Sequence, residues 1–211
     1  MKTTKLASMI LGSLFLFLAA LAARAQQADW VKLTADAKAA RQSGNFSDSA
    51  TLYKQALGIQ EQTFGPESQE VATTLNNLAV LYQDQSNDAE AEPLYRRSLS
   101  IWEKNAGSPM QIAASMNNLA ALFHDERKDA EAESLYNRAL AIWEKAGQLE
   151  SPSAIAALTN LADIYYSRAN LYRSQSNYDE TDTNQDFLQH CVEILPQRVL
   201  TCLRQSTTER Q

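Results

Sequence analysis

The chain has 211 residues, a formal net charge of −6, and 45% apolar residues. This length allows one domain with a sizeable core. The acidic balance, without any stretch in which Lys or Arg alternates with aromatic residues, excludes the electrostatic footprint of nucleic-acid binding and gives no attraction to anionic lipid.

The N-terminal segment has the three parts of a secretory signal peptide. Met1–Lys5 carries two lysines, Leu6–Ala22 is almost entirely apolar, and Ala23–Ala25 supplies the small-x-small pattern of a cleavage site. We expect cleavage after Ala25 and a secreted or periplasmic mature chain without a membrane anchor. The alternative is a retained anchor helix, because the apolar run reaches about the minimum length of a membrane span. Removing residues 1–25 takes away three bases and no acid, so the net charge becomes about −9.

The segment 26–178 contains a tandem repeat. Val71–Lys104 realigns on Ile112–Lys145 after a shift of about 41 positions, so that Asn-Asn-Leu-Ala and Ile-Trp-Glu-Lys both recur. A period of about 40 residues without a strand signal predicts an all-α solenoid, in which each helical hairpin buries its apolar face against its neighbours. Three to four repeats are expected, at about 30–70, 71–111, 112–153, and 154–178 and beyond.

The first repeat, from Trp30 to Gly65, diverges most from the others. It places Asp36 and Lys38 where the next repeat has Leu78 and Val80. Polar residues at these positions are expected in a terminal repeat, because one of its sides faces water.

The second repeat shows two apolar stripes at helical spacing, separated by the turn-forming residues 86–88. The stripes consist of Val71, Leu75, Leu78, Ala79, Leu81 and Tyr82, and of Ala89, Ala91, Leu94, Tyr95, Leu99 and Trp102. We expect Gly65 with Pro66, Gly107 with Pro109, and Gly147 with Pro152 to stop the second helices. Trp102 and Trp143 are expected in the core.

The two segments 72–82 and 89–99 resemble the tetratricopeptide repeat in its longer, kinesin-light-chain-like form. The resemblance implies a right-handed superhelix of helical hairpins, whose first helices line a concave groove that holds peptides or partner proteins. The glycine that usually closes the turn within a repeat is Gly44 in the first repeat, but Ser86 and Arg127 in the next two. We therefore expect the hairpins to pack slightly less tightly than is usual in the family.

Asparagines recur in the middle of the first helices, where this residue is a mediocre helix former. They are Asn76, Asn77, Asn117, Asn118 and Asn160. The resemblance implies that Asn77, Asn118 and Asn160 face the groove, where a carboxamide can donate to and accept from the main chain of an extended peptide. The alternative is that these asparagines bond neighbouring helices.

Further along the first helices, other polar residues should border the same groove, because they lie three to eight residues beyond the asparagines. They are Gln83, Asp84, His124, Asp125, Asp163 and Tyr166. Lys38 and Arg41 are the only nearby bases, so a neutral or basic peptide partner is favoured.

The fourth repeat starts regularly and then departs from the pattern. Ile164-Tyr165 is echoed seven residues later by Leu171-Tyr172, which predicts a lengthened first helix with its turn near 176–178. We interpret 179–211 as a degenerate capping segment, in which the apolar stretch Phe187–Leu195 folds back and ends at Pro196. A truncated or rearranged end of a longer array is the alternative.

No motif for catalysis or for phosphate binding occurs, so we predict neither enzymatic activity nor a cofactor. His190 beside Cys191 is the nearest approach to a metal-ligand pair, but the spacing is not that of a metal site. Cys191 and Cys202 would lie about 16 Å apart on one unbroken helix, so a disulfide between them requires a fold-back at Pro196.

These observations predict an exported adaptor that binds a protein or peptide segment. One alternative is an architectural or oligomerising subunit that docks through its C-terminal end. Another is an accessory protein of an enzyme, with a weak metal site at His190 and Cys191. The oligomeric state stays open.

Overall fold

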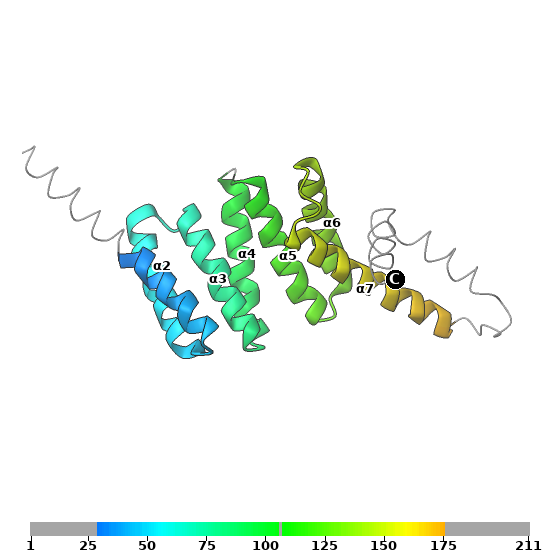
Figure 1. Cartoon of the computed structure of the whole chain (residues 1–211), viewed down its shortest axis with the longest axis horizontal. Coiled ribbons are helices and arrows are strands. Elements are labelled where there is room, and N and C mark those ends of the chain that lie inside the picture. Colours follow the sequence, from blue (N-terminus) through cyan, green and yellow to red (C-terminus); the bar gives the residue numbers. More distant parts are fainter. Residues whose placement is uncertain (1–28, 106, 176–211) are drawn as a thin grey trace, which may run out of the picture. The chain divides into compact units, whose positions relative to one another are not determined.

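The computed structural model describes residues 29–105 and 107–175. They belong to two compact units, one on each side of residue 106, which we call unit 1 and unit 2. Every regular element among the described residues is an α-helix (Figure 1). No helix in this part of the chain is long and apolar enough to cross a membrane.

Unit 1 consists of two helical hairpins. The first pairs a helix over residues 29–42 with α2 (Phe46–Phe64), and the second pairs α3 (Gln69–Asp84) with α4 (Asp88–Lys104). Helix α3 packs against both α2 and α4. Its first turn is capped by Ser68, whose hydroxyl accepts from the backbone N–H of Val71 at 3.3 Å, and this satisfies a donor that the helix itself leaves unpaired.

Unit 2 contains one complete hairpin, of α5 (Pro109–Asp125) and α6 (Asp129–Lys145), followed by α7 (Pro152–Gln175). Helix α7 packs against both α5 and α6. It has 24 residues where α5 has 17, in agreement with the lengthened first helix that the sequence predicts for the fourth repeat. The expected turn near 176–178 and the capping segment lie outside the described residues.

The apolar stripes form the core, with one exception. In α3, Val71, Leu75, Ala79 and Leu81 are fully buried, and Leu78 joins Ala37, Tyr53 and Leu81 in a cluster that spans the two hairpins of unit 1. Trp102 and Trp143 are also buried. Ala89 is exposed, so its assignment to the core was wrong. It lies two residues before the buried Ala91, about 200° around the helix, so it is on the side of α4 opposite the buried stripe.

The turns within the hairpins share one geometry, although only the first contains glycine. Gly44, Ser86 and Arg127 have φ angles of 79°, 56° and 63°. In each turn the following residue donates its N–H to a carbonyl five residues earlier, as Asn87 does to Tyr82 at 2.9 Å and Lys128 to Phe123 at 2.8 Å. This closure satisfies carbonyls at the end of the helix. The repeat therefore keeps its turn by placing two non-glycine residues in left-handed backbone.

The prolines between the hairpins have a different role from the one expected. Pro109 and Pro152 each begin the next helix rather than stop the previous one. Proline suits the first turn, because its φ is already helical and the N–H that it lacks would have no partner there. Helices α2 and α6 are followed by glycines with positive φ, Gly65 at 90° and Gly147 at 66°, as the pattern predicted.

The tryptophan lies on the first helix of the first hairpin but on the second helix of the next two hairpins. Positions 30, 72 and 113 are equivalent in the repeat, and so are positions 60, 102 and 143. The later hairpins have alanine on the first helix and tryptophan on the second, all buried. The first hairpin instead has Trp30 on its first helix and Gln60, 1% exposed, on α2. Trp30 packs edge to face on Phe64, with ring centroids 6.1 Å apart. The first hairpin therefore has its larger residue on the first helix, and its second residue, glutamine, is larger than the alanine of the later hairpins.

Candidate functional site

In unit 1, the predicted asparagines lie half-buried in the middle of α3. Asn76 has an interaction partner. Asn77 makes no side-chain hydrogen bond among the residues that the structure describes. A carboxamide that is half-buried in this way forgoes part of its hydration without gaining a protein partner.

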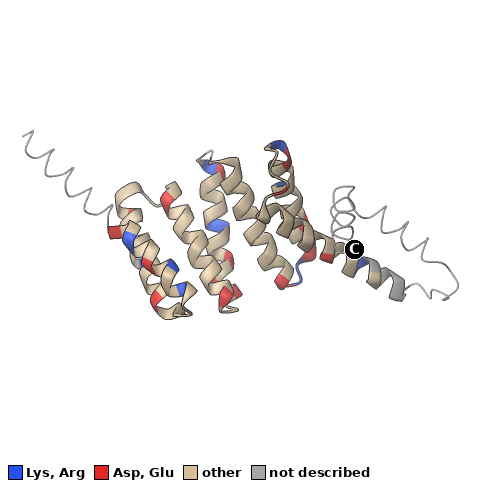
Figure 2. Cartoon of the chain, viewed as in Figure 1, with Lys and Arg blue, Asp and Glu red and all other residues tan. Residues whose placement is uncertain are grey.

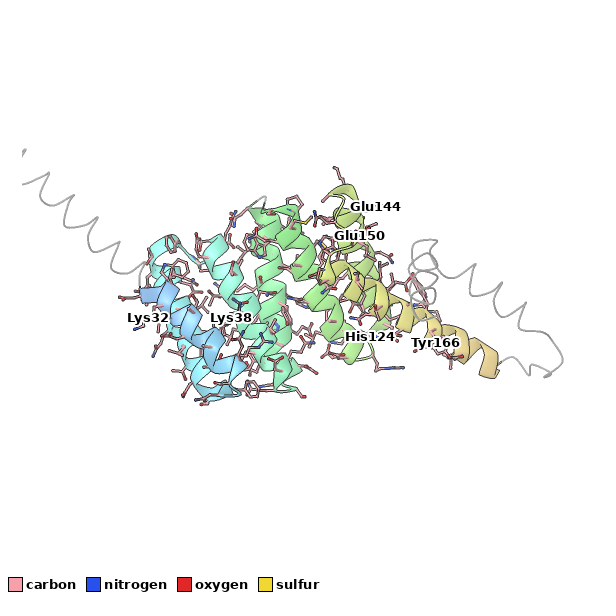
Figure 3. The ribbon with its side chains drawn as sticks, in the orientation of Figure 1. Lys32, Lys38, His124, Glu144, Glu150 and Tyr166 are labelled. Atoms are coloured by element: carbon pink, nitrogen blue, oxygen red, sulfur yellow. The ribbon has the colours of Figure 1, made fainter. Side chains whose placement is uncertain are left out.

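The end of α3 is linked to the neighbouring helices. The Tyr95 hydroxyl donates to Gln83 Oε1 at 2.9 Å, which joins α4 to α3. The Arg41 guanidinium donates to the Asp84 carboxylate, and this hydrogen bond raises the pKa of Arg41. Asp84 is therefore neutralised by one of the two bases noted in the sequence, whereas Lys38 is exposed (Figure 3). The helix that carries both bases also carries acids along its length (Figure 2).

In unit 2, the predicted residues of α5 have several surroundings. Asn117 and Asn118 are half-buried; Asn118 has an interaction partner, whereas Asn117 Oδ1 is buried without a hydrogen bond in the described part of the chain. His124 Nδ1 lies 3.0 Å from Asp129 Oδ1, across the turn between α5 and α6. Asp125 is exposed.

Asn160 of α7 bonds a neighbouring helix, the alternative that the sequence left open. Its Nδ2 donates to the Tyr136 hydroxyl of α6 at 2.8 Å. Burial raises the pKa of Tyr136 to about 12; the bond from Asn160 lowers it, and the charge of Asp125 raises it. The hydroxyl therefore stays protonated at neutral pH. Asn160 Oδ1 has no hydrogen bond among the described residues, so this amide keeps an acceptor for a ligand.

Asp163 and Tyr166 lie on the exposed surface of α7, and the Tyr166 side chain is 64% exposed (Figure 3). A residue beside them, Tyr165, is instead buried and donates its hydroxyl to Glu133 Oε1 at 2.7 Å. Burial, reinforced by the bond to Glu133, raises the pKa of Tyr165 to about 12. Arg168 donates to the other oxygen of Glu133 at 2.6 Å, which fixes α7 on α6.

The structure thus brings together only part of the predicted set. In unit 2, Asp125 and Asn160 both act on the Tyr136 hydroxyl. In unit 1, Gln83 and Asp84 are both held by other helices. Tyr95 was predicted in the core for its ring alone, and the hydrogen bonds of the Tyr95 and Tyr136 hydroxyls were not predicted. The sequence could have predicted that these hydroxyls are hydrogen-bonded, because a buried tyrosine hydroxyl normally has a polar partner.

The described residues contain no group of three His, Cys, Asp or Glu side chains that could hold a metal ion. His190, Cys191 and Cys202, which carry the metal-pair and disulfide hypotheses, lie outside the described residues.

Comparison with known proteins relates this chain to one repeat family. The family model described as tetratricopeptide repeat matches residues 36–104 and 111–181. No curated protein matches the chain.

Solved structures support the longer form of the repeat. Putative kinesin light chain repeats of Podosopora anserina share 21% identity, with 85% of this chain and 96% of that chain covered and a TM-score of 0.60. BtubC (BKLC) from P. vanneervenii shares 23% identity over 77% of this chain, with a TM-score of 0.59; this chain spans 61% of BtubC. The N-terminal domain of stress-induced protein-1 (STI-1) from C. elegans shares 16% identity over 66% of this chain and 97% of that one, with a TM-score of 0.51.

These similarities confirm the helical-hairpin solenoid and its kinesin-light-chain-like repeats. The fold is that of a protein–protein interaction module, of a kind that is generally not enzymatic. The chain belongs to the tetratricopeptide repeat family.

Proposed function

We propose that this chain is an exported adaptor, which binds an extended segment of a partner protein along the first helices of its hairpins, without catalysis or cofactor. Proteins of this family bind protein partners, and hairpin solenoids offer extended surfaces for them. The signal-like segment 1–25 supports the export.

The observation that carries the proposal is the carboxamide of Asn77. It lies in the middle of α3, half-buried and without a side-chain hydrogen bond in the described part of the chain. An amide in this position can donate to a peptide carbonyl and accept from a peptide N–H at once, so it recognises main chain whatever the peptide sequence. Asn160 Oδ1 and Asn117 Oδ1 provide further acceptors in unit 2.

The charges near these amides support a neutral or basic partner. Asp84 is neutralised by Arg41, so unit 1 contributes little negative charge at this end of α3. In unit 2, Asp163 is exposed and makes no ion pair with a described residue. A basic residue of the partner would therefore bind near α7. Exposed charges of this kind contribute about 0.5 to 1 kcal/mol, so they bias the choice of partner more than they set the affinity.

The test begins with a peptide library displayed against the purified chain. The Kd of the enriched peptides is then measured by fluorescence anisotropy for the wild type, Asn77→Ala and Asn87→Ala. We expect Asn77→Ala to weaken binding by about 1 kcal/mol, roughly fivefold, because each buried amide bond contributes about that much. Its melting temperature should stay unchanged.

Asn87→Ala is the matched control. Asn87 is exposed and makes no side-chain cap bond at the start of α4, so this variant should bind like the wild type. A library without enriched peptides would contradict the adaptor function. If the peptides bind the wild type and Asn77→Ala equally well, α3 is not part of the binding surface.

A further inference from the structure

One face of α7 is uncovered where the equivalent faces of α3 and α5 are covered. We call it the open face of α7, and its residues are Ile155, Thr159, Ala162 and Tyr166. They lie four, three and four positions apart, so they form one stripe along the helix. Ile155 is 46% exposed and Tyr166 is 64% exposed.

In the complete hairpins, the second helix buries the alanines of this stripe and leaves its polar residues half-buried. The positions in α3 that correspond to Ile155 and Ala162 are Ala72 and Ala79, both 0% exposed. Helix α4 bonds this face near each end: Ser98 Oγ donates to the Ala72 carbonyl at 2.7 Å, and Tyr95 donates to Gln83 at 2.9 Å. The corresponding alanines of α5, Ala113 and Ala120, are likewise 0% exposed. The open face therefore has the position of a second-helix contact.

The sequence after α7 contains a segment with the spacing of a second helix. In α6, five apolar residues from Leu135 to Trp143 are buried and Ile142 is half-buried, and six apolar residues follow these six 52 positions later at identical spacing. The first set is Leu135, Tyr136, Ala139, Leu140, Ile142 and Trp143, and the second is Phe187, Leu188, Cys191, Val192, Ile194 and Leu195. Pro196 follows immediately, so a helix would end there.

The sizes of the residues on the two sides are complementary. Where the second and third hairpins pair alanine with tryptophan, the fourth has Ile155 and Leu195, two residues of intermediate size. Where the second hairpin pairs Gln83 with Tyr95, the fourth has Tyr166 and Leu188. In the first hairpin too, the first helix carries a larger residue, Trp30, and the second helix a smaller one, Gln60. Volume-conserving exchanges are those that a packed interface tolerates best.

The length of the intervening chain fits a return to this face. Helix α7 continues to Gln175, eight residues beyond Ser167, the equivalent of Asp125 at the end of α5. These residues add about 12 Å of helix. Residues 176–186 can span up to about 36 Å when extended. This length is enough to run back past the additional 12 Å of helix and to place Phe187 beside α7 at the level that Leu135 of α6 has beside α5.

We propose that Phe187–Leu195 covers the open face of α7 as the second helix of a fourth hairpin. In this arrangement Cys191 takes the position of Ser98 and Ala139, both 0% exposed, and lies against Ile155. Cys191 is then a small packing residue with a shielded thiol, and it does not pair with Cys202.

A cysteine cross-link tests this contact in the full chain. In a Cys202→Ser background, Ile155→Cys is oxidised with diamide and analysed on a non-reducing gel and by peptide mapping. Residues in direct contact across a hairpin satisfy the distance that a disulfide requires, so we expect an intramolecular bond between positions 155 and 191. Ala156→Cys is the control: it is the next residue, it is exposed, and it should form no such bond.

Two results would overturn the proposal. A disulfide-linked dimer would assign the open face to a second copy of the chain. If the variant has normal helical content by circular dichroism but forms no disulfide, Cys191 does not lie against position 155. A measurement on the unmodified chain covers the case in which the variant fails to fold. In the presence of reductant, alkylation followed by mass spectrometry should modify Cys202 at least tenfold faster than Cys191. Equal rates, or a Cys191–Cys202 bridge before reduction, would also overturn it.

Discussion

Two turn residues hold left-handed backbone without being glycine, Ser86 with φ 56° and Arg127 with φ 63°. A side chain in this conformation costs about 1 to 2 kcal/mol, because its Cβ crowds the following carbonyl. Glycine avoids that cost but loses more entropy on folding, by about 0.5 to 1 kcal/mol. We expect Ser86→Gly and Arg127→Gly each to raise the free energy of unfolding by about 0.5 to 1 kcal/mol, as measured by urea denaturation.

Gln85→Gly is the matched control for this prediction. Gln85 precedes Ser86 and has a φ of −94°, so glycine there gains no relief of strain. The variant also loses the hydrogen bond from Gln85 Nε2 to the Leu81 carbonyl, so it should be less stable than the wild type. If all three glycine variants lost stability alike, the strain attributed to the turns would be refuted.

The buried Tyr136 hydroxyl makes stability depend on alkaline pH. Its folded pKa of about 12 exceeds the value of about 10 in the unfolded chain. Above pH 10 the unfolded state loses this proton while the folded state retains it. The contribution of the raised Tyr136 pKa to the free energy of unfolding is therefore complete below pH 10. It is lost as the pH rises to 12, which should lower the free energy of unfolding by about 1 to 2 kcal/mol.

Urea denaturation at pH 9 and pH 11.5 measures this loss, and Tyr136→Phe separates it from the effect of other groups. The variant should be less stable than the wild type at pH 9, because Asn160 loses its partner, but its stability should fall less steeply with pH. Parallel pH profiles for the two proteins would exclude Tyr136 as the titrating group.

At the scale of the helices, unit 1 depends on a few buried contacts between hairpins. Leu78 is 2% exposed and packs with Ala37 and Tyr53 of the first hairpin. Leu78→Ala should lower the free energy of unfolding by about 2 to 5 kcal/mol, because it leaves a cavity between stacked hairpins. Since each repeat is stabilised by its neighbours, hydrogen exchange should accelerate in both hairpins of unit 1.

Val31→Ala provides the control for this experiment. Val31 is 47% exposed on the first described helix, so its truncation should change stability by less than about 0.5 kcal/mol. Faster exchange confined to α3 and α4 would show that the two hairpins do not stabilise each other.

Sequence periodicity predicts these helices well, because a buried stripe must recur with the helical period wherever it lies against a neighbour. It assigns Leu75 and Trp102 correctly but fails at Ala89, since a small apolar residue near a helix start is tolerated in water as readily as in the core. The partners of polar side chains were harder to foresee. Nothing in the spacing indicates that Asp84 would bond Arg41 or that Asn160 would bond Tyr136, because such bonds join helices that are distant in sequence.

At the scale of the whole molecule, export would change both the length and the charge of the chain. Intact mass measurement of the protein recovered from a secreting host should show a chain that begins at Gln26 and lacks residues 1–25. Ala25→Lys should block cleavage, because a large charged residue cannot occupy the position next to the cut. A wild-type chain that retains Met1 and sediments with membranes would establish the anchor helix instead.

Each complete hairpin contains one tryptophan, which lies on the first helix of the first hairpin and on the second helix of the other two. The chain has three: Trp30 in the first hairpin, Trp102 in the second and Trp143 in the third, with α7 containing none. Each complete hairpin therefore has its own intrinsic fluorophore, and variants that keep one tryptophan and replace the other two by phenylalanine would report one hairpin each. The order in which the repeats lose their structure, and whether the two units do so together, can be observed by emission alone without attaching a dye.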